Sequence, residues 1–213
     1  MGFKGLALAL FAAIGLAAGA AQAVAQTPVK IVGFGDSLMA GYNLEAGEGF
    51  PARLEAALRA RGHDVTIADA GVSGDTTSGG LARLDWSIPE GTDGVILELG
   101  ANDALRGLPP ETTRQNLEAM IVRLQERGIA VLLAGMLAPP NLGADYEAAF
   151  NAIYPDLAAK YGLLHYPFFL DGVTGDAAMV LDDGMHPNAK GINKMVDGML
   201  PLAEEFVTAI EAR

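Results

Sequence analysis

Four short polar segments carry the residues best suited to chemistry in this 213-residue chain. Three of them, 35–38 (GDSL), 71–75 (GVSGD) and 100–103 (GAND), each follow a run of apolar residues, and the fourth, 182–187 (DDGMHP), precedes the last helical stretch. Together they hold serine, histidine and carboxylate side chains, which serve as nucleophile, general base and orienting group in acyl transfer. The segments therefore predict nucleophilic catalysis, provided that the fold brings them together.

Serine is the candidate nucleophile, because the composition excludes cysteine. The chain has no cysteine, which excludes thiolate catalysis, disulfides and cysteine-ligated metal sites. Its four serines all lie outside any G-x-S-x-G pattern, so the nucleophile elbow of the α/β-hydrolases is absent. A serine hydroxyl needs a base, and the position of a histidine therefore decides which serine is used.

Three histidines are available, and His186 is the one placed to act as a base. His63 follows a helix-ending glycine on the side of the expected sheet away from the polar segments, and His165 lies inside an expected strand, where we interpret it as a packed core residue. His186 precedes a proline, which favours a helix boundary. Asp183 stands three residues upstream, and the intervening glycine lets the chain fold back. Asp183 would then hold one ring nitrogen while the other faces Ser37.

The same segments offer donors for the negative oxygen that forms when a serine attacks an acyl carbonyl. The candidates are the backbone N–H of Ser37, the backbone N–H of Gly74 and the side-chain amide of Asn102. Glycine at position 74 allows a substrate to approach the backbone closely. We interpret the neighbouring Asp36 and Asp75 as turn formers without a catalytic task.

Alternating apolar runs and helical stripes are the elements that must position these residues. The predicted strands are 29–34, 65–68, 94–99, 129–134 and 163–168. The predicted helices are 50–61, 77–84, 110–127, a single helix through 146–157, and the stretch after His186, which Pro201 either kinks or divides. Strands that are apolar on both faces predict a five-stranded parallel sheet covered by helices on both sides. Such sheets bind ligands beyond the carboxyl ends of their strands, which is where the polar segments fall.

The polar segments, in this order, resemble the four signature blocks of the GDSL/SGNH hydrolase family. The resemblance extends from residue 30 to the C-terminal helix. GDSLxxGY at 35–42, SGDTT at 73–77 and DDGMHPN at 182–188 are most similar to the bacterial periplasmic arylesterase, acyl-CoA thioesterase and lysophospholipase branch. The resemblance implies a three-layer α/β sandwich of flavodoxin-like type and a metal-independent serine hydrolase without a cofactor.

The resemblance also implies roles for individual residues. Ser37 is implied as the nucleophile, His186 as the base and Asp183 as its orienting group, with Ser37, Gly74 and Asn102 forming the oxyanion hole. The loop after Asn102 resembles the acyl-contacting loop of the branch, and its apolar character favours an acyl chain. We therefore expect substrate contacts from a set of apolar residues, namely Ala104, Leu105, Leu108, Pro109 and, after the fourth strand, Met136. Leu137, Pro139 and Pro140 are expected beside Met136, in the wall opposite the loop that follows Asn102.

The first 25 residues are interpreted as a signal peptide. Lys4 precedes an apolar run from residue 5 to residue 21, and small residues then offer cleavage after Ala23 or Ala25. An uncleaved membrane anchor is the alternative, because the run is just long enough to span a bilayer. We expect a single hydrolase domain over 26–213, exported to the periplasm or secreted, with no stable membrane insertion after processing.

The net charge of −12 restricts the partners, because an acidic surface repels nucleic acid and anionic lipid. The expected partner is a small-molecule acyl ester or thioester. Three alternatives stay open: a sugar-ester deacetylase on the same fold, a metal-dependent phosphoesterase that uses the Asp, Asn and His residues of the four segments, and an exported binding protein without catalysis.

Overall fold

The structure, a computed structural model, describes residues 1–2 and 27–213. Residues 3–25 of the predicted signal peptide lie outside the described part, so that prediction is not tested. Within residues 1–2 and 27–213, every helix is too short or too polar to cross a membrane.

Five strands form one parallel sheet in the described part of the chain. They are β1 (Val29–Gly35), β2 (Val65–Gly71), β3 (Gly94–Glu98), β4 (Ala130–Ala134) and β5 (Leu164–Tyr166). The order across the sheet is β2-β1-β3-β4-β5, and every neighbouring pair is parallel. The predicted α/β fold with a five-stranded parallel sheet is thus confirmed. The chain changes direction across the sheet between β1 and β3, which is the switch point where such sheets bind ligands.

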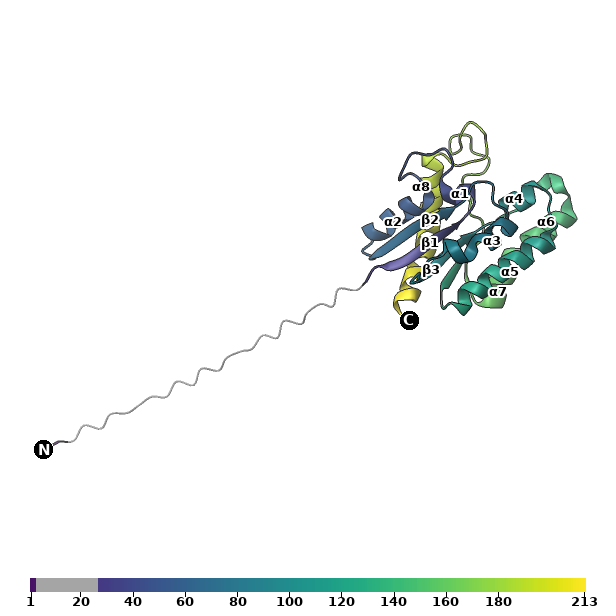
Figure 1. The fold of residues 1–213 in the computed structure, drawn as a ribbon. Helices are drawn as coiled ribbons and strands as arrows, with labels where there is room; N and C mark the ends of the chain where they lie inside the picture. The colour runs from purple at the N-terminus through teal and green to yellow at the C-terminus, as the bar shows by residue number, and fades with distance from the viewer. Residues whose placement is uncertain (3–26) are drawn as a thin grey trace.

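Helices cover both faces of the sheet (Figure 1). They are α1 (Ser37–Ala40), α2 (Phe50–Ala60), α3 (Thr77–Ser87), α4 (Ala101–Leu105), α5 (Pro110–Glu126), α6 (Ala144–Asn151), α7 (Ile153–Tyr161) and α8 (Ala189–Glu211), with a 3₁₀ turn, η1 (Pro140–Leu142). Helices α2 and α8 pack together on one face, whereas α3, α5 and α7 pack in a row on the other. The short helices α1 and α4, which the sequence analysis did not predict, begin where β1 and β3 end.

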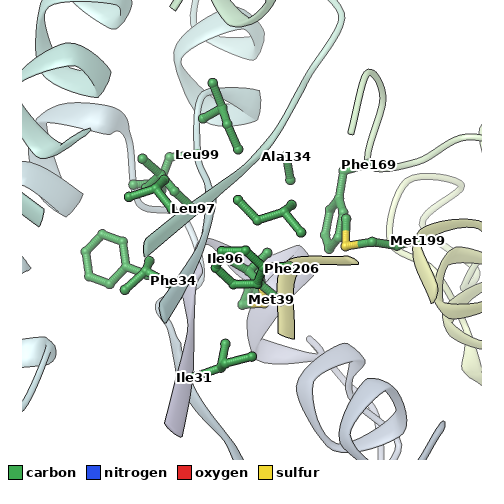
Figure 2. Packing of buried hydrophobic residues seen from close by; sticks show 14 of the residues in the cluster. Ile31, Phe34, Met39, Ile96, Leu97, Leu99, Ala134, Phe169, Met199 and Phe206 are labelled. Carbon is green, nitrogen blue, oxygen red and sulfur yellow. The ribbon is translucent and has the colours of Figure 1, made fainter. Parts of the chain in front are cut away.

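Alternating strand side chains fill the two halves of the core (Figure 2). Phe34 and Leu97 lie toward one face of the sheet, and Ile96 lies toward Phe206 of α8 on the other. Strands β3 and β4 are buried along their whole length, which explains their nearly continuous apolar sequences. The central strands therefore form a rigid base for the loops at their carboxyl ends.

The stretch predicted as one helix through 146–157 is two helices, because the chain breaks at Ala152 between α6 and α7. Pro155 explains the break, since its ring excludes a helical carbonyl at Asn151, four residues earlier. Proline is tolerated in the first turn of α7, where the backbone N–H groups have no acceptor within the helix.

Helix α8 runs through Pro201 without dividing. Pro201 cannot donate to the carbonyl of Asp197, but both residues are exposed, so water can bind that oxygen. The apolar side of α8, with Met195, Met199 and Phe206, stays buried against the sheet and holds the helix in place.

Candidate active site

The structure brings Ser37, His186 and Asp183 into one hydrogen-bonded chain. His186 Nε2 lies 2.9 Å from Ser37 Oγ, and His186 Nδ1 lies 2.7 Å from Asp183 Oδ2. An ionised carboxylate only accepts hydrogen bonds, so Nδ1 carries the ring proton and Nε2 is left to accept the serine proton. This geometry satisfies the requirements of a nucleophile, a general base and an orienting group.

Ser37 is positioned by the junction between β1 and α1. It is the first residue of α1 and is buried. Asp36 caps this helix by accepting a hydrogen bond from the Leu38 N–H at 3.0 Å. The cap and the strand end fix the backbone on both sides of Ser37, so its hydroxyl is presented at the carboxyl edge of the sheet.

His186 is held in a tight loop directly before α8. The loop closes through a bridge between Val180 and Pro187, and Gly184 turns the chain with a φ of 69°. Asn188, the N-cap of α8, donates from its side chain to the Val180 carbonyl and accepts from the Gly191 N–H. The start of α8 therefore anchors the loop that carries the histidine and its carboxylate.

The surroundings of Asp183 stabilise its ionised form beside His186. Its Oδ1 accepts hydrogen bonds from the backbone N–H groups of His186 at 3.0 Å and Met185 at 2.9 Å. These backbone bonds, together with the His186 ring, lower the pKa of Asp183 to about 2. Tyr42 packs against the other side of the histidine, with ring centroids 4.4 Å apart. The imidazole is thus oriented by a carboxylate and by an aromatic contact that the sequence analysis missed.

The three predicted oxyanion-hole residues line the same cavity as Ser37 and His186. The Ser37 N–H opens helix α1 and has no acceptor within that helix. Gly74 adopts a φ of 84°, which favours glycine, and its carbonyl accepts from Arg106 at 2.8 Å. The Asn102 amide donates to Asp36 Oδ2 at 3.0 Å, which leaves its second N–H to face a substrate.

Asp36 does more than the predicted turn forming. It is fully buried, caps α1 and holds the Asn102 side chain. Burial raises the pKa of Asp36 to about 6. The buried Glu98 side chain lies behind it, accepts from the Asp36 N–H at 3.2 Å, and has a pKa raised well above its ordinary value, mainly by burial. A pair of buried carboxyl groups therefore supports the backbone next to Ser37.

Asp75 is likewise more than a turn former. Its carboxylate accepts a 2.6 Å hydrogen bond from Nε of Arg83, a buried residue of α3. Arg83 is not among the residues predicted from the sequence. An arginine on a short amphipathic helix gives no sign, from sequence alone, that it points inward toward a carboxylate eight residues earlier.

An apolar cavity of about 670 Å³ opens beside Ser37. Ala138 and Phe168 line it, together with six of the residues predicted to contact a substrate: Ala104, Leu105, Met136, Leu137, Pro139 and Pro140. Leu108 and Pro109, which were predicted to contact substrate, do not line it. They connect α4 to α5, where the Leu108 N–H donates to the Asp103 carbonyl and the Leu108 carbonyl accepts from Tyr146.

The residues of the alternative metal site are engaged with the protein. The Asp103 carboxylate accepts hydrogen bonds from Thr77 and Thr113, and Asp75 binds Arg83. Among residues 1–2 and 27–213, no three His, Asp or Glu side chains are grouped as metal ligands.

The other two histidines lie outside the Ser37–His186–Asp183 hydrogen bonds. His63 faces Glu204 of α8 at 3.8 Å. His165 lies in β5 and packs beside Gly135, and burial lowers its pKa. His63 lies apart from the polar segments, as predicted, whereas His165, predicted as a core residue, is only partly buried because β5 is an edge strand.

Residues 34–192 match the model of the GDSL-like Lipase/Acylhydrolase family. The chain is 41% identical to an arylesterase of Vibrio mimicus over 167 residues, which are 78% of this chain and 84% of the relative. It is 37% identical to thioesterase 1/protease 1/lysophospholipase L1 of Escherichia coli K12 over 174 residues, covering 81% and 82%. The crystal structure of AlinE4, an SGNH-hydrolase family esterase, superimposes with a TM-score of 0.71 at 46% identity, covering 84% of this chain and 96% of that one.

Proposed function

Because the chain belongs to the GDSL-like lipase/acylhydrolase family, we propose that it is a serine esterase that cleaves acyl esters through an acyl-enzyme intermediate. One observation carries the proposal. The hydrogen-bonded chain from Asp183 through His186 to Ser37 ends at the floor of an apolar cavity. A nucleophile, its base and a site for an acyl group thus occupy one place.

The mechanism follows from the positions of the protons. His186 Nε2 takes the hydroxyl proton as Ser37 Oγ attacks the acyl carbonyl carbon, and Asp183 stabilises the imidazolium that forms. The Ser37 and Gly74 N–H groups and the Asn102 amide stabilise the tetrahedral oxyanion. His186 then gives its proton to the departing alkoxide or thiolate. Water repeats the sequence on the acyl-enzyme, which releases the carboxylic acid and restores Ser37.

The cavity supports an acyl chain as the recognised group. Ala104, Leu105 and Met136 supply apolar wall, and burying each methylene of a chain contributes roughly 0.8 kcal/mol. Carboxylic and lysophospholipid esters are the proposed substrates, and thioester hydrolysis is a further capability because the same attack expels a thiolate. A sugar-ester deacetylase is the second candidate, since the same triad would remove an acetyl group.

Export is part of the proposal. A signal peptide at 1–25 would take away one lysine and no acidic residue, which leaves a strongly acidic mature chain, 26–213. We place this enzyme in the periplasm or outside the cell. Acyl-CoA is a cytosolic metabolite, so acyl esters are the substrates that the exported enzyme would meet more often. Its acidic charge argues against nucleic acid as a partner.

A chain-length series with p-nitrophenyl esters from C2 to C12 tests the proposal, with wild type and Ser37→Ala assayed side by side. The expected result is a preference that rises to C8 or beyond and vanishes in Ser37→Ala, with EDTA without effect. A sharp optimum at C2 favours the deacetylase. Activity that survives Ser37→Ala but is lost in EDTA favours a metal enzyme. A wild type inactive on every acyl ester favours a binding protein.

A further inference from the structure

Arg83 lies buried beneath the two backbone segments that carry oxyanion-hole candidates. It is only 7% exposed, and all three nitrogens of its guanidinium donate hydrogen bonds. Nε donates to Asp75 Oδ2 at 2.6 Å, Nη1 to the Ala70 carbonyl at 2.8 Å and Nη2 to the Gly35 carbonyl at 2.8 Å. Its guanidinium carbon also lies 4.0 Å from the centroid of the Phe34 ring. A planar group held on four sides is fixed in position and orientation.

The acceptors of Arg83 belong to the two segments that end at Ser37 and Gly74. Gly35 is the last residue of β1, two positions before Ser37, and Asp75 directly follows Gly74. The Gly35 carbonyl also accepts from the Val72 N–H at 3.0 Å, and the Val72 carbonyl accepts from the Asp75 N–H at 3.1 Å. One guanidinium therefore ties both backbone donors of the oxyanion hole to each other.

The ion pair between Arg83 and Asp75 gives the turn at Gly74 a buried contact in addition to an exposed one. On its outer side this turn is bound by the exposed Arg106, through the Gly74 carbonyl. On its inner side the turn is bound by the buried Arg83, through the carboxylate of Asp75. A buried charge needs its counter-charge, so the Asp75 side chain cannot leave Arg83 without a large cost. The inner contact is thus the one that sets the position of the turn.

We propose that Arg83 and Asp75 are positioning residues for catalysis, which hold the Ser37 and Gly74 N–H groups at the spacing that the tetrahedral oxyanion requires. This role rests on the proposed serine-esterase function. Neither side chain is needed to touch the substrate. Their effect is expected on kcat rather than KM, because the donors are used in the transition state and the acyl chain binds elsewhere in the cavity.

The test compares Arg83→Gln, Arg83→Lys and Asp75→Asn with wild type, by p-nitrophenyl octanoate hydrolysis at a temperature where circular dichroism shows each variant folded. Misplaced catalytic groups cost up to ~10²-fold, so we expect kcat to fall roughly 10- to 100-fold with KM within about threefold. Lysine cannot reach three acceptors at once, so Arg83→Lys should not restore kcat. Arg83→Gln combined with Asp75→Asn should be little worse than either single variant, because both act through one contact.

Two controls separate positioning from general loss of stability. Arg123→Gln removes the exposed Arg123–Asp85 pair, which also involves α3, and should leave kcat unchanged. Leu124→Ala destabilises the core away from the site and should lower the melting temperature without lowering kcat.

An active wild type whose folded Arg83 and Asp75 variants keep kcat within twofold would overturn the positioning role and leave the esterase proposal standing. The same holds if Arg83→Lys restores full activity, or if Leu124→Ala lowers kcat as much as Arg83→Gln does. A wild type inactive on every acyl ester would instead contradict the proposed function itself.

Discussion

His186 Nε2 lies 2.9 Å from the hydroxyl oxygen of Ser37, although the two residues are 149 positions apart. Ser37 is fixed where β1 enters α1, and His186 is fixed by the loop that Asn188 anchors to the start of α8. The hydrogen bond through which the serine proton would leave therefore joins two positions that the backbone fixes independently.

Replacing Asp183 by Asn should disable the histidine without unfolding the protein. An amide offers no ionised acceptor for Nδ1–H, so the ring tautomer that activates Ser37 loses its support. We expect kcat for an aryl ester to fall ~10²–10⁴-fold, the lower part of that range reflecting partial replacement by water at an exposed carboxylate.

Asp182→Asn is the matched control for Asp183, since it makes the same change one residue earlier in the loop, on a side chain outside the His186 hydrogen bonds. It should retain full activity. An Asp183→Asn enzyme that keeps more than a tenth of the wild-type kcat would contradict the assigned role.

Replacing Asn102 by Ala should remove one donor of the oxyanion hole. Loss of one such donor costs ~10²–10³ in kcat, and KM should change little. Asn116→Ala is the control, because Asn116 donates to Thr77 and Ser78 outside the cavity. Equal effects of the two substitutions on kcat would show that Asn102 has no special part in the transition state.

Replacing Glu98 by Gln should change how stability depends on pH. The pKa of Glu98 is raised in the folded protein, so the folded state binds more protons than the unfolded state above pH 4.5, and wild-type stability falls as pH rises. Glutamine resembles the neutral acid and does not titrate, so the variant does not lose stability through this position as the pH rises. The unfolding free energy of Glu98→Gln relative to wild type should therefore increase between pH 5 and pH 8 in urea titrations.

A constant difference in unfolding free energy over that pH range would show that Glu98 titrates alike in both states. Asp36, whose pKa is raised to about 6 by burial, adds to the fall in wild-type stability between pH 4 and pH 7 and remains present in both proteins. Because the Asp36 charge helps to raise the pKa of Glu98, the comparison reports the titration of this buried pair.

Shortening Leu105 should alter substrate selection, whereas shortening Leu108 should not. Leu105, the last residue of α4, lines the cavity, whereas Leu108, three residues later in the connection to α5, does not. Leu105→Ala removes part of the apolar wall of the cavity, so KM for a C8 ester should rise roughly 5- to 30-fold, at about 1–2 kcal/mol of lost contact, with less effect on C2. A larger effect from Leu108→Ala in chain-length assays would mean that the acyl chain lies elsewhere.

The sequence predicted the sheet and the positions of Ser37, Asp183 and His186 because those features are local. Apolar runs mark the buried strands, and an aspartate, a glycine and a histidine within four positions mark the triad loop. The topology then brings the strand ends together, as in other parallel sheets. The break at Ala152 could also have been found, since Pro155 is visible in the sequence.

The supporting contacts could not be predicted, because they join residues far apart in the chain. Arg83 reaches the Gly35 carbonyl across 48 positions, and Asn102 reaches Asp36 across 66. Their side chains gave no periodic or motif signal. Leu108 and Pro109 were predicted as substrate contacts from the family resemblance and the apolar character of their loop, but they do not line the cavity, and the Leu108 N–H donates to the Asp103 carbonyl.

Labelling with a fluorophosphonate tests whether Ser37 is the activated nucleophile, because the reagent reacts with an activated serine to give a stable adduct. We expect one adduct per chain, located by peptide mass spectrometry on Ser37, with labelling lost in Ser37→Ala and strongly slowed in His186→Ala. Labelling of Ser37→Ala at the wild-type rate, or an adduct on another of the four serines, would contradict this expectation.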